Sequence, residues 1–191
     1  MKTLYYTLFI CGLLFPPPAM AQKYVSVSHD TIATSYNGMN FSSEKSLLEN
    51  LQPHEGFSTI AEFIEANAVS IFDEDFMGTV FVTTNSSFEA EEDTEEDDVD
   101  LNLASNRQKI LKFHIVPGRL DAYGIKKAVE KGGGTAYFAT LQGENLGARL
   151  IDGEVVLFDS ENNTATIIGS DLYHKHGFFH IIEGLLLPKI E

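Results

Sequence analysis

Four short runs rich in β-forming residues, each bounded by turn residues, fill the C-terminal half of the chain. They cover residues 135–141, 148–151, 155–159 and 164–168. The pair Asp152-Gly153 between the second and third runs is typical of a two-residue hairpin turn, and Asn162-Asn163 marks the next turn. Because short turns join antiparallel neighbours, this half of the chain is predicted to form an antiparallel meander.

The preceding part of the chain carries helical patterns. Apolar residues recur at the spacing of one buried helix face in residues 44–51, 57–68 and 120–131. Pro53 ends the first of these segments, and the glycine triplet 132–134 ends the last. A strand is expected over residues 79–83, which alternate β-branched and aromatic side chains. Helices packed on antiparallel strands define an α+β fold.

Residues 107–115 combine a helical pattern with a strand pattern. They begin as the end of a helix and are expected to continue as an apolar strand that contains Ile110, Leu111, Phe113 and Ile115. The turn pair Pro117-Gly118 ends this strand. Upstream of residue 44 lies a polar lead in which YVSVSHDTIATSY (24–36) is interpreted as an edge strand.

The first 21 residues have the features of an export signal. Lys2 supplies a positive charge, residues 4–15 form an apolar stretch, and Ala19-Met20-Ala21 is a small-residue cleavage site, so the mature chain would start at Gln22. An apolar stretch this short is not expected to cross a hydrocarbon core about 30 Å thick. The only cysteine, Cys11, lies within this leader, so the mature chain depends on its core rather than on disulfides.

The chain is strongly acidic. Its formal net charge is −15 at pH 7, which repels phosphate backbones and anionic lipid surfaces and argues against a nucleic-acid partner. Residues 89–100 carry nine carboxylates in twelve positions, a block that repels itself and is expected to form a solvated loop. Calcium binding is the competing interpretation, but this run lacks the glycine and the ligand spacing of an EF-hand loop.

Three segments carry a resemblance to a known family. In chain order they read GTVFVTTNSSF (78–88), LKFHIVPG (111–118) and GFFHIIEGLLLP (177–188). They resemble the TVFAPTNEAF strand, the YHVVPG-like segment and the closing NGVIHVID.VLLP segment of fasciclin domains, in particular bacterial secreted single-domain members. The resemblance spans about residues 46–188. It implies a fasciclin-like fold, with N-terminal helices packed on a wedge of antiparallel β-sheets, and a protein that works by adhesion and binding.

Candidate binding residues come from the same segments. In the fasciclin pattern a tyrosine precedes the histidine that corresponds to His114, and this pair is linked to integrin contact in animal members. Phe113 replaces the tyrosine here, which removes a hydrogen bond typically worth about 0.5–1.5 kcal/mol and argues against an integrin-type partner. The expected binding face lies near Phe113 and His114. Asn85 is the third candidate, interpreted first as a turn residue that caps the following helix.

No metal site is predicted, although one histidine cluster offers nominal candidates. His174 and His176 would share a face of an extended segment, with Asp171 as a third ligand for zinc. Fasciclin domains have a turn here, and His180 corresponds to the recurrent histidine of their last strand, which favours a structural role. The sequence also contains no GxSxG elbow, HExxH pair, P-loop or cysteine nucleophile.

These observations define the expected protein. Residues 1–21 are a signal peptide, residues 22–43 an N-terminal lead, and residues 44–191 a fasciclin-like domain that contains the acidic loop 89–100. The expected function is that of an exported, non-catalytic adhesion or binding module, which would be secreted, periplasmic or on the cell surface. Its expected partner is an extracellular protein or polysaccharide, with no cofactor, nucleic acid or membrane span.

Two alternatives remain. The first is a carrier of a small apolar ligand, such as a carotenoid or lipid, in a pocket lined by Phe138, Phe158, Phe178 and Phe179; these rings would otherwise pack in the core. The second is a metal-binding hydrolase, which rests on the histidine cluster alone.

Overall fold

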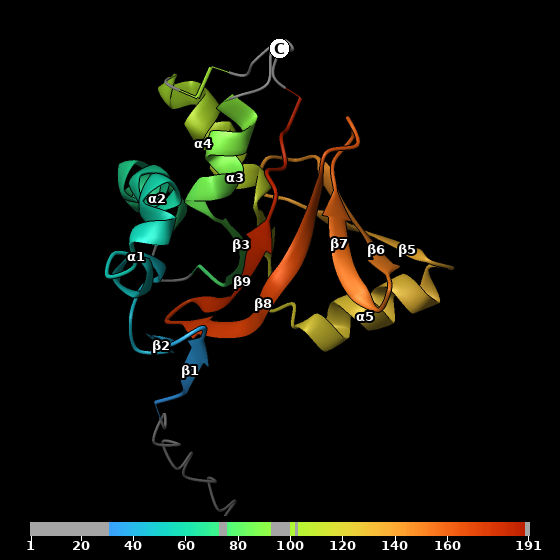
Figure 1. Cartoon of the computed structure of the whole chain (residues 1–191), viewed down its shortest axis with the longest axis horizontal. Coiled ribbons are helices and arrows are strands. Elements are labelled where there is room, and N and C mark those ends of the chain that lie inside the picture. Colours follow the sequence, from blue (N-terminus) through green and yellow to red (C-terminus); the bar gives the residue numbers. More distant parts are fainter. Residues whose placement is uncertain (1–30, 73–75, 93–99, 102, 190–191) are drawn as a thin grey trace, which may run out of the picture. The chain divides into compact units, whose positions relative to one another are not determined.

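A computed structural model describes residues 31–72, 76–92, 100–101 and 103–189 of the chain (Figure 1). The expected signal peptide (1–21), the start of the lead segment and residues 93–99 of the acidic run lie outside these ranges. None of the helices within the described ranges is both long and apolar enough to cross a membrane.

The described part of the chain begins with a hairpin and a group of helices. These are β1 (Ala33–Tyr36), β2 (Met39–Ser42), α1 (Leu47–Leu51), η1 (Glu55–Phe57) and α2 (Ser58–Ile71). β1 is the described end of the expected edge strand, and it pairs only with β2 in a separate two-stranded sheet. α1 starts later than expected because Ser46 and Glu49 form a capping box: each side chain accepts a hydrogen bond from the other residue's backbone N–H.

The next five elements include one correction to the sequence analysis. They are β3 (Gly78–Thr83), α3 (Asn85–Glu92), α4 (Ala104–Phe113), β4 (Ile115–Pro117) and α5 (Ala122–Lys131). The strand expected through Ile110 and Phe113 is wrong, since these residues form the last turn of α4 and the chain becomes extended only at Ile115. A short apolar run does not distinguish a buried strand from a buried helix, and here the run lies on the helix.

The C-terminal half forms the meander that the sequence predicts. Its strands are β5 (Thr135–Ala139), β6 (Asn145–Ile151), β7 (Glu154–Phe158), β8 (Thr164–His174) and β9 (Gly177–Glu183). With β3 and β4 they form a seven-stranded sheet in the order β4-β3-β9-β8-β7-β6-β5, in which only β3 and β9 are parallel. Just beyond β5, Leu141 N–H donates to Ile115 C=O at 2.9 Å, so the two edges meet and the mixed sheet nearly closes.

β8 is longer than expected, and its length changes the geometry of the histidine cluster. The strand continues past residue 168 to His174, with irregular pairing around Gly169 that absorbs extra residues. Gly177 pairs with His174, so residues 175–176 form a hairpin turn. His174 therefore ends a strand and His176 lies in the turn, which means that the two do not share a face of one extended segment.

Two apolar clusters lie on the two faces of the central strands β3 and β9. Val80 and Val82 belong to the cluster that includes residues of α1 to α4, whereas Phe81 belongs to the cluster that includes residues of α5 and of β5 to β8. Figure 1 shows the same division, with α1 to α4 on one side of β3 and β9 and α5 on the other. Because both faces of β3 are covered, its central residues Val80, Phe81 and Val82 are apolar on both faces.

Candidate functional site

The expected binding pair, Phe113 and His114, lies inside the protein. Their side chains are 1% and 0% exposed, where α4 ends and β4 begins. Phe113 belongs to the apolar cluster around α5. A partner that docks on the surface would not touch either side chain. Replacing Phe113 or His114 would therefore affect binding only by disturbing the fold.

His114 is held by hydrogen bonds at both ring nitrogens. Nδ1 lies 2.9 Å from Ile110 C=O and therefore carries the proton, while Nε2 accepts from the Thr83 hydroxyl at 3.3 Å. Burial lowers the pKa of His114 to about 4, so the ring is neutral at physiological pH. Neither nitrogen is free to act as a general base.

The ring of His180 on β9 is likewise buried and hydrogen-bonded at both nitrogens. Its Nε2 donates to Leu120 C=O at 2.8 Å, and its Nδ1 accepts from Asp171 N–H at 3.2 Å. The ring stacks on Phe81 with the centroids 5.5 Å apart, and burial lowers its pKa. These contacts connect β3, β8, β9 and the segment before α5, as expected for a structural histidine.

Asn85 connects two helices. Its Oδ1 accepts from Thr59 N–H in the first turn of α2 at 3.1 Å. Its Nδ2 donates to Glu55 C=O at 2.8 Å and to Ser58 Oγ at 2.7 Å. The side chain therefore satisfies a backbone donor at the start of α2, rather than one in its own helix α3.

The nominal metal ligands do not converge. The Asp171 carboxylate accepts from Ala122 N–H at the start of α5 at 2.8 Å, and the rings of His174 and His176 are 6.2 Å apart. Within the ranges given above, no three His, Cys, Asp or Glu side chains are grouped closely enough to hold a metal ion. His174 is 2% exposed, and its Nε2 has no hydrogen-bond partner among the described residues. Burial, with His176 close by, lowers the pKa of His174 to about 4.

A hollow of about 530 Å³ opens on the face of β5, β6 and β7 that points away from α5. Tyr137, Gly147 and Phe158 lie side by side there, because Gly147 pairs with Tyr137 on one neighbouring strand and with Phe158 on the other. The two rings meet edge to face across the glycine, with the centroids 5.9 Å apart. A Cβ on Gly147 would lie 2.3 Å from the Phe158 ring, so the glycine makes room for the aromatic pair.

Polar side chains surround this pair. Glu144, Asn145, Ser160 and Asn162 line the same hollow, which we call the aromatic hollow. Asn145, Ser160 and Asn162 are exposed, and their side chains form no hydrogen bond within the described part of the chain. The hollow therefore offers an aromatic surface beside exposed hydrogen-bond donors and acceptors.

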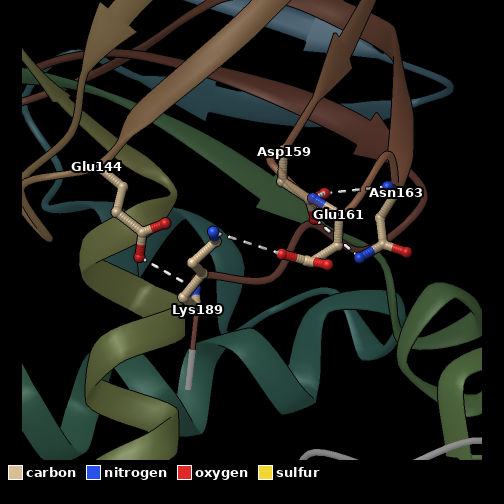
Figure 2. Close-up of polar contacts among 5 residues, drawn as sticks. All are labelled: Glu144, Asp159, Glu161, Asn163 and Lys189. Atoms are coloured by element: carbon tan, nitrogen blue, oxygen red, sulfur yellow. Dashed lines mark hydrogen bonds and ion pairs between the residues drawn. The ribbon is translucent and has the colours of Figure 1, made fainter. Parts of the chain in front are cut away.

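Asp159 fixes the loop at one end of the aromatic hollow (Figure 2). Its carboxylate is 4% exposed and accepts four hydrogen bonds. Oδ1 accepts from Glu161 N–H at 2.9 Å and from Asn163 N–H at 3.0 Å. Oδ2 accepts from Asn163 Nδ2 at 2.8 Å and from Leu187 N–H at 2.9 Å. Asp159 is thus occupied by the fold and is not free for a ligand.

The C-terminal segment joins the two loops beside the aromatic hollow. Lys189 N–H donates to the Glu144 carboxylate at 3.0 Å, and the Lys189 ammonium lies 3.9 Å from the Glu161 carboxylate, as Figure 2 shows. The β5–β6 loop and the β7–β8 loop are therefore held by one strap of chain. An ion pair this exposed contributes little stability by itself.

The aromatic hollow was not predicted from the sequence. Phe158 was expected to line one pocket with Phe138, Phe178 and Phe179, but Phe179 is fully buried, Phe138 packs on the α5 cluster and Phe178 packs against Tyr173. One signal was available, because a glycine inside a strand often marks a close approach, and Gly147 is such a residue. Which rings meet at Gly147 depends on strand register, which the sequence did not define.

A second hollow, of about 460 Å³, lies beside Asn85. Its apolar lining comes from β1, β2, η1, β8 and β9, and we call it the apolar hollow. The lining side chains include Tyr36, Met39, Phe57, Ile168 and Ile181.

The described residues form an α+β domain in which buried His114 and His180 are hydrogen-bonded, and the aromatic hollow and the apolar hollow open at its surface. Residues 55–188 match the fasciclin domain. The chain is 30% identical over 186 residues to Protein sll1483 of Synechocystis sp. (strain ATCC 27184 / PCC 6803 / Kazusa), covering 95% of this chain and 93% of that protein. Its fold is similar to that of a FAS1 domain pair from the insect cell adhesion molecule fasciclin I, with a TM-score of 0.60 and 12% identity over 83% of this chain and 67% of that chain.

The chain therefore belongs to the fasciclin domain family. Its fold, helices in the N-terminal half and a nearly closed seven-stranded mixed sheet, is the FAS1 fold. Fasciclin domains are generally non-catalytic binding modules associated with adhesion.

Proposed function

We propose that the protein is an exported, non-catalytic adhesion or binding module whose partner is an extracellular polysaccharide or protein. Membership of the fasciclin family carries this proposal. The contacts of His114 and His180 support the non-catalytic part, because a general base needs a nitrogen within reach of its substrate, and both rings are buried with both nitrogens bonded.

Binding of the purified protein to an immobilised panel tests this proposal. The panel contains neutral polysaccharides, anionic polysaccharides and extracellular matrix proteins, each with and without calcium. Saturable binding to at least one member supports an adhesion module, and calcium dependence would bring the acidic run 89–100 into the mechanism. A protein that binds no member contradicts the proposal.

Export and the domain boundaries belong to the same proposal. Residues 1–21 would be removed as a signal peptide, leaving the lead segment 22–43 and the fasciclin domain within 44–191. The protein recovered outside the cytoplasm should then have the intact mass of a chain that starts at Gln22. A protein that keeps its first 21 residues and stays in the cytoplasm would contradict export.

Carriage of a small apolar ligand is the alternative function. The apolar hollow supports it, because hollows of this size lined by apolar and aromatic side chains are typical of small-molecule sites. Solvent extraction of the purified protein tests the alternative: a bound pigment or lipid supports a carrier, and a clean extract contradicts it. A metal-binding hydrolase is the third candidate, and elemental analysis that finds no bound metal would contradict it.

A further inference from the structure

We propose that the aromatic hollow is a binding site for a neutral glycan, with one pyranose ring lying against the exposed face of Tyr137. This inference rests on the proposed binding function and adds to it a site and a chemical class of ligand. The observations that carry it are the exposed aromatic surface, the polar side chains of Asn145, Ser160 and Asn162, which form no hydrogen bond with other described residues, and the sign of the local charge.

The aromatic surface fits one face of a sugar ring. A pyranose has an apolar face of C–H groups, whose hydrogens carry a small positive charge and are attracted to the negative face of an aromatic ring. Tyr137 is 64% exposed on the sheet face, and its ring contacts the half-buried Phe158 edge to face. The guanidinium of Arg149 lies over Phe158, 5.3 Å from the ring centroid. Arg149 thus packs on Phe158, and Phe158 in turn restrains Tyr137 before a ligand arrives, which reduces the side-chain entropy lost on binding.

The polar surround fits the hydroxyl groups of a sugar. The amides of Asn145 and Asn162 each offer donors and an acceptor, and Ser160 offers a hydroxyl group that can do either. Glu144 accepts Lys189 N–H through Oε1, which leaves its Oε2 available as an acceptor. Since none of these groups has to break an internal hydrogen bond, a ligand would displace only water.

The charge around the hollow selects a neutral chain. Glu144, Asp159 and Glu161 place three carboxylates at this end of the sheet, and the whole chain has a net charge of −15. Of the nearby cations, Lys189 faces Glu161 and Arg149 packs on Phe158. Sulfated or uronic-acid polymers would therefore be repelled.

The position of the hollow on the sheet argues against a peptide. An extended peptide binds most simply by adding a strand to a free sheet edge. Tyr137, Gly147 and Phe158 line the hollow from the face of the sheet, across three paired strands, where the backbone groups are already hydrogen-bonded. The hollow also lies in the size range of small-ligand sites, so a few sugar units fit it better than a protein surface does.

A tryptophan reporter tests the position of the ligand. The chain contains no tryptophan, so Tyr137→Trp introduces a single emitter and keeps an aromatic ring at the site. Tyr123→Trp is the matched control, because Tyr123 is 70% exposed on α5 and lies outside the hollow. Cellohexaose, laminarihexaose, mannohexaose and chitohexaose are the probes. We expect at least one of them to give a saturable change in emission at position 137 and none at position 123.

Affinity measurements test the contribution of each side chain. For the probe that binds, Tyr137→Ala should weaken binding by at least about tenfold, the loss expected for one aromatic contact and its buried area. Asn145→Ala and Asn162→Ala should each weaken binding by about threefold to tenfold, the loss of one hydrogen bond. Tyr123→Ala should leave the affinity unchanged, and circular dichroism of every variant checks that it is folded.

Each contrary outcome has a distinct meaning. Glycan binding that survives Tyr137→Ala, or equal emission changes at positions 123 and 137, overturns the site and leaves the binding function standing. Binding to heparin or polygalacturonate with no binding to the four neutral probes overturns the neutral class. Binding to a matrix protein alone, unaffected by Tyr137→Ala, rejects the glycan site but supports the broader function. A protein that binds none of the probes or panel members overturns both.

Discussion

The buried histidines and the aromatic hollow both contain polar groups, but these groups differ in whether their hydrogen bonds are already formed. His114 and His180 lie inside the protein and use both ring nitrogens. Asn145 and Asn162 lie at the surface, and their side chains form no hydrogen bond with other described residues. The first set holds strands and helices together, whereas the second set is available to a ligand.

This difference separates the residues that identify the family from the residues proposed to bind. His114 and His180 belong to the segments that carry the fasciclin resemblance, and both stabilise the fold. The aromatic hollow is built from β5, β6 and β7 and their loops, which lie between those segments. The family motif in this chain therefore indicates the architecture, and the proposed glycan site is built from residues outside the motif.

We expect the largest loss of stability from Asp159, whose carboxylate borders the aromatic hollow but is fully hydrogen-bonded within the fold. Asp159→Ala removes the acceptor of four hydrogen bonds, and an unsatisfied buried donor costs about 1–3 kcal/mol, so the free energy of unfolding should fall by about 3–5 kcal/mol. Urea denaturation measures this change. The control is Glu161→Ala, which removes an exposed ion pair and should cost under about 1 kcal/mol. Equal losses in the two variants would contradict the assignment of Asp159 to the fold.

Acid should destabilise the fold through buried histidines, including His174. Burial holds the pKa of His114 and His174 at about 4, below the ordinary value of 6.5, so between these pH values the unfolded chain binds more protons than the folded chain. The stability from this difference is complete above pH 6.5 and is lost as the pH falls towards 4, by about 3 kcal/mol for each histidine.

His174→Leu isolates one part of this pH dependence. The variant removes one of the buried histidines whose pKa is lowered, and it also removes a buried Nε2 that has no partner in the described part of the chain. The free energy of unfolding, measured by urea titration between pH 7 and pH 4, should therefore fall by about 3 kcal/mol less than in the unmodified protein. A pH dependence identical to that of the unmodified protein would show that His174 does not titrate as proposed.

Asn85 and Asn145 are expected to give the smallest effects, and the two variants should change opposite quantities: stability for Asn85 and glycan affinity for Asn145. Asn85→Ala removes three hydrogen bonds that connect α3 to η1 and to the start of α2, so it should cost about 1–2 kcal/mol of stability and leave glycan affinity unchanged. Asn145→Ala should do the reverse, with stability changed by less than about 0.5 kcal/mol and weaker glycan binding. Urea denaturation and calorimetric titration of both variants measure the pair. Loss of affinity in Asn85→Ala would break the separation between the two sets.

Much of the fold follows from local patterns in the sequence. The hairpin at Asp152-Gly153 and the helices ended by Pro53 and by the glycine triplet 132–134 are confirmed, because turn and cap residues act over a few positions. The strand through Ile110 and the end of the fourth run at residue 168 were wrong. In both places tertiary packing decided the outcome: α4 packs on α2, and pairing with β9 carries β8 past its irregular residues.

The candidate site was harder to predict. Phe113 and His114 are expected at a binding face only from the family resemblance. In the structure Phe113 packs in the apolar cluster around α5, and His114 bonds Ile110 and Thr83, the latter 31 positions away. Tyr137, Gly147 and Phe158 come from three strands, and their alignment depends on register. Lys189 reaches Glu144 from 45 positions away. Such long-range contacts have no local signature.

The most direct test compares Thr83→Val with Tyr137→Ala in one pair of assays, urea denaturation and hexasaccharide titration. Thr83→Val removes the hydroxyl that donates to buried His114, so it should lower the free energy of unfolding by about 1–3 kcal/mol, while the folded protein keeps its affinity. Tyr137→Ala should lower the affinity at least about tenfold and change stability by less than about 0.5 kcal/mol. A folded Thr83→Val protein that no longer binds, beside a Tyr137→Ala protein that binds normally, would place the binding site at the buried histidine and contradict the account.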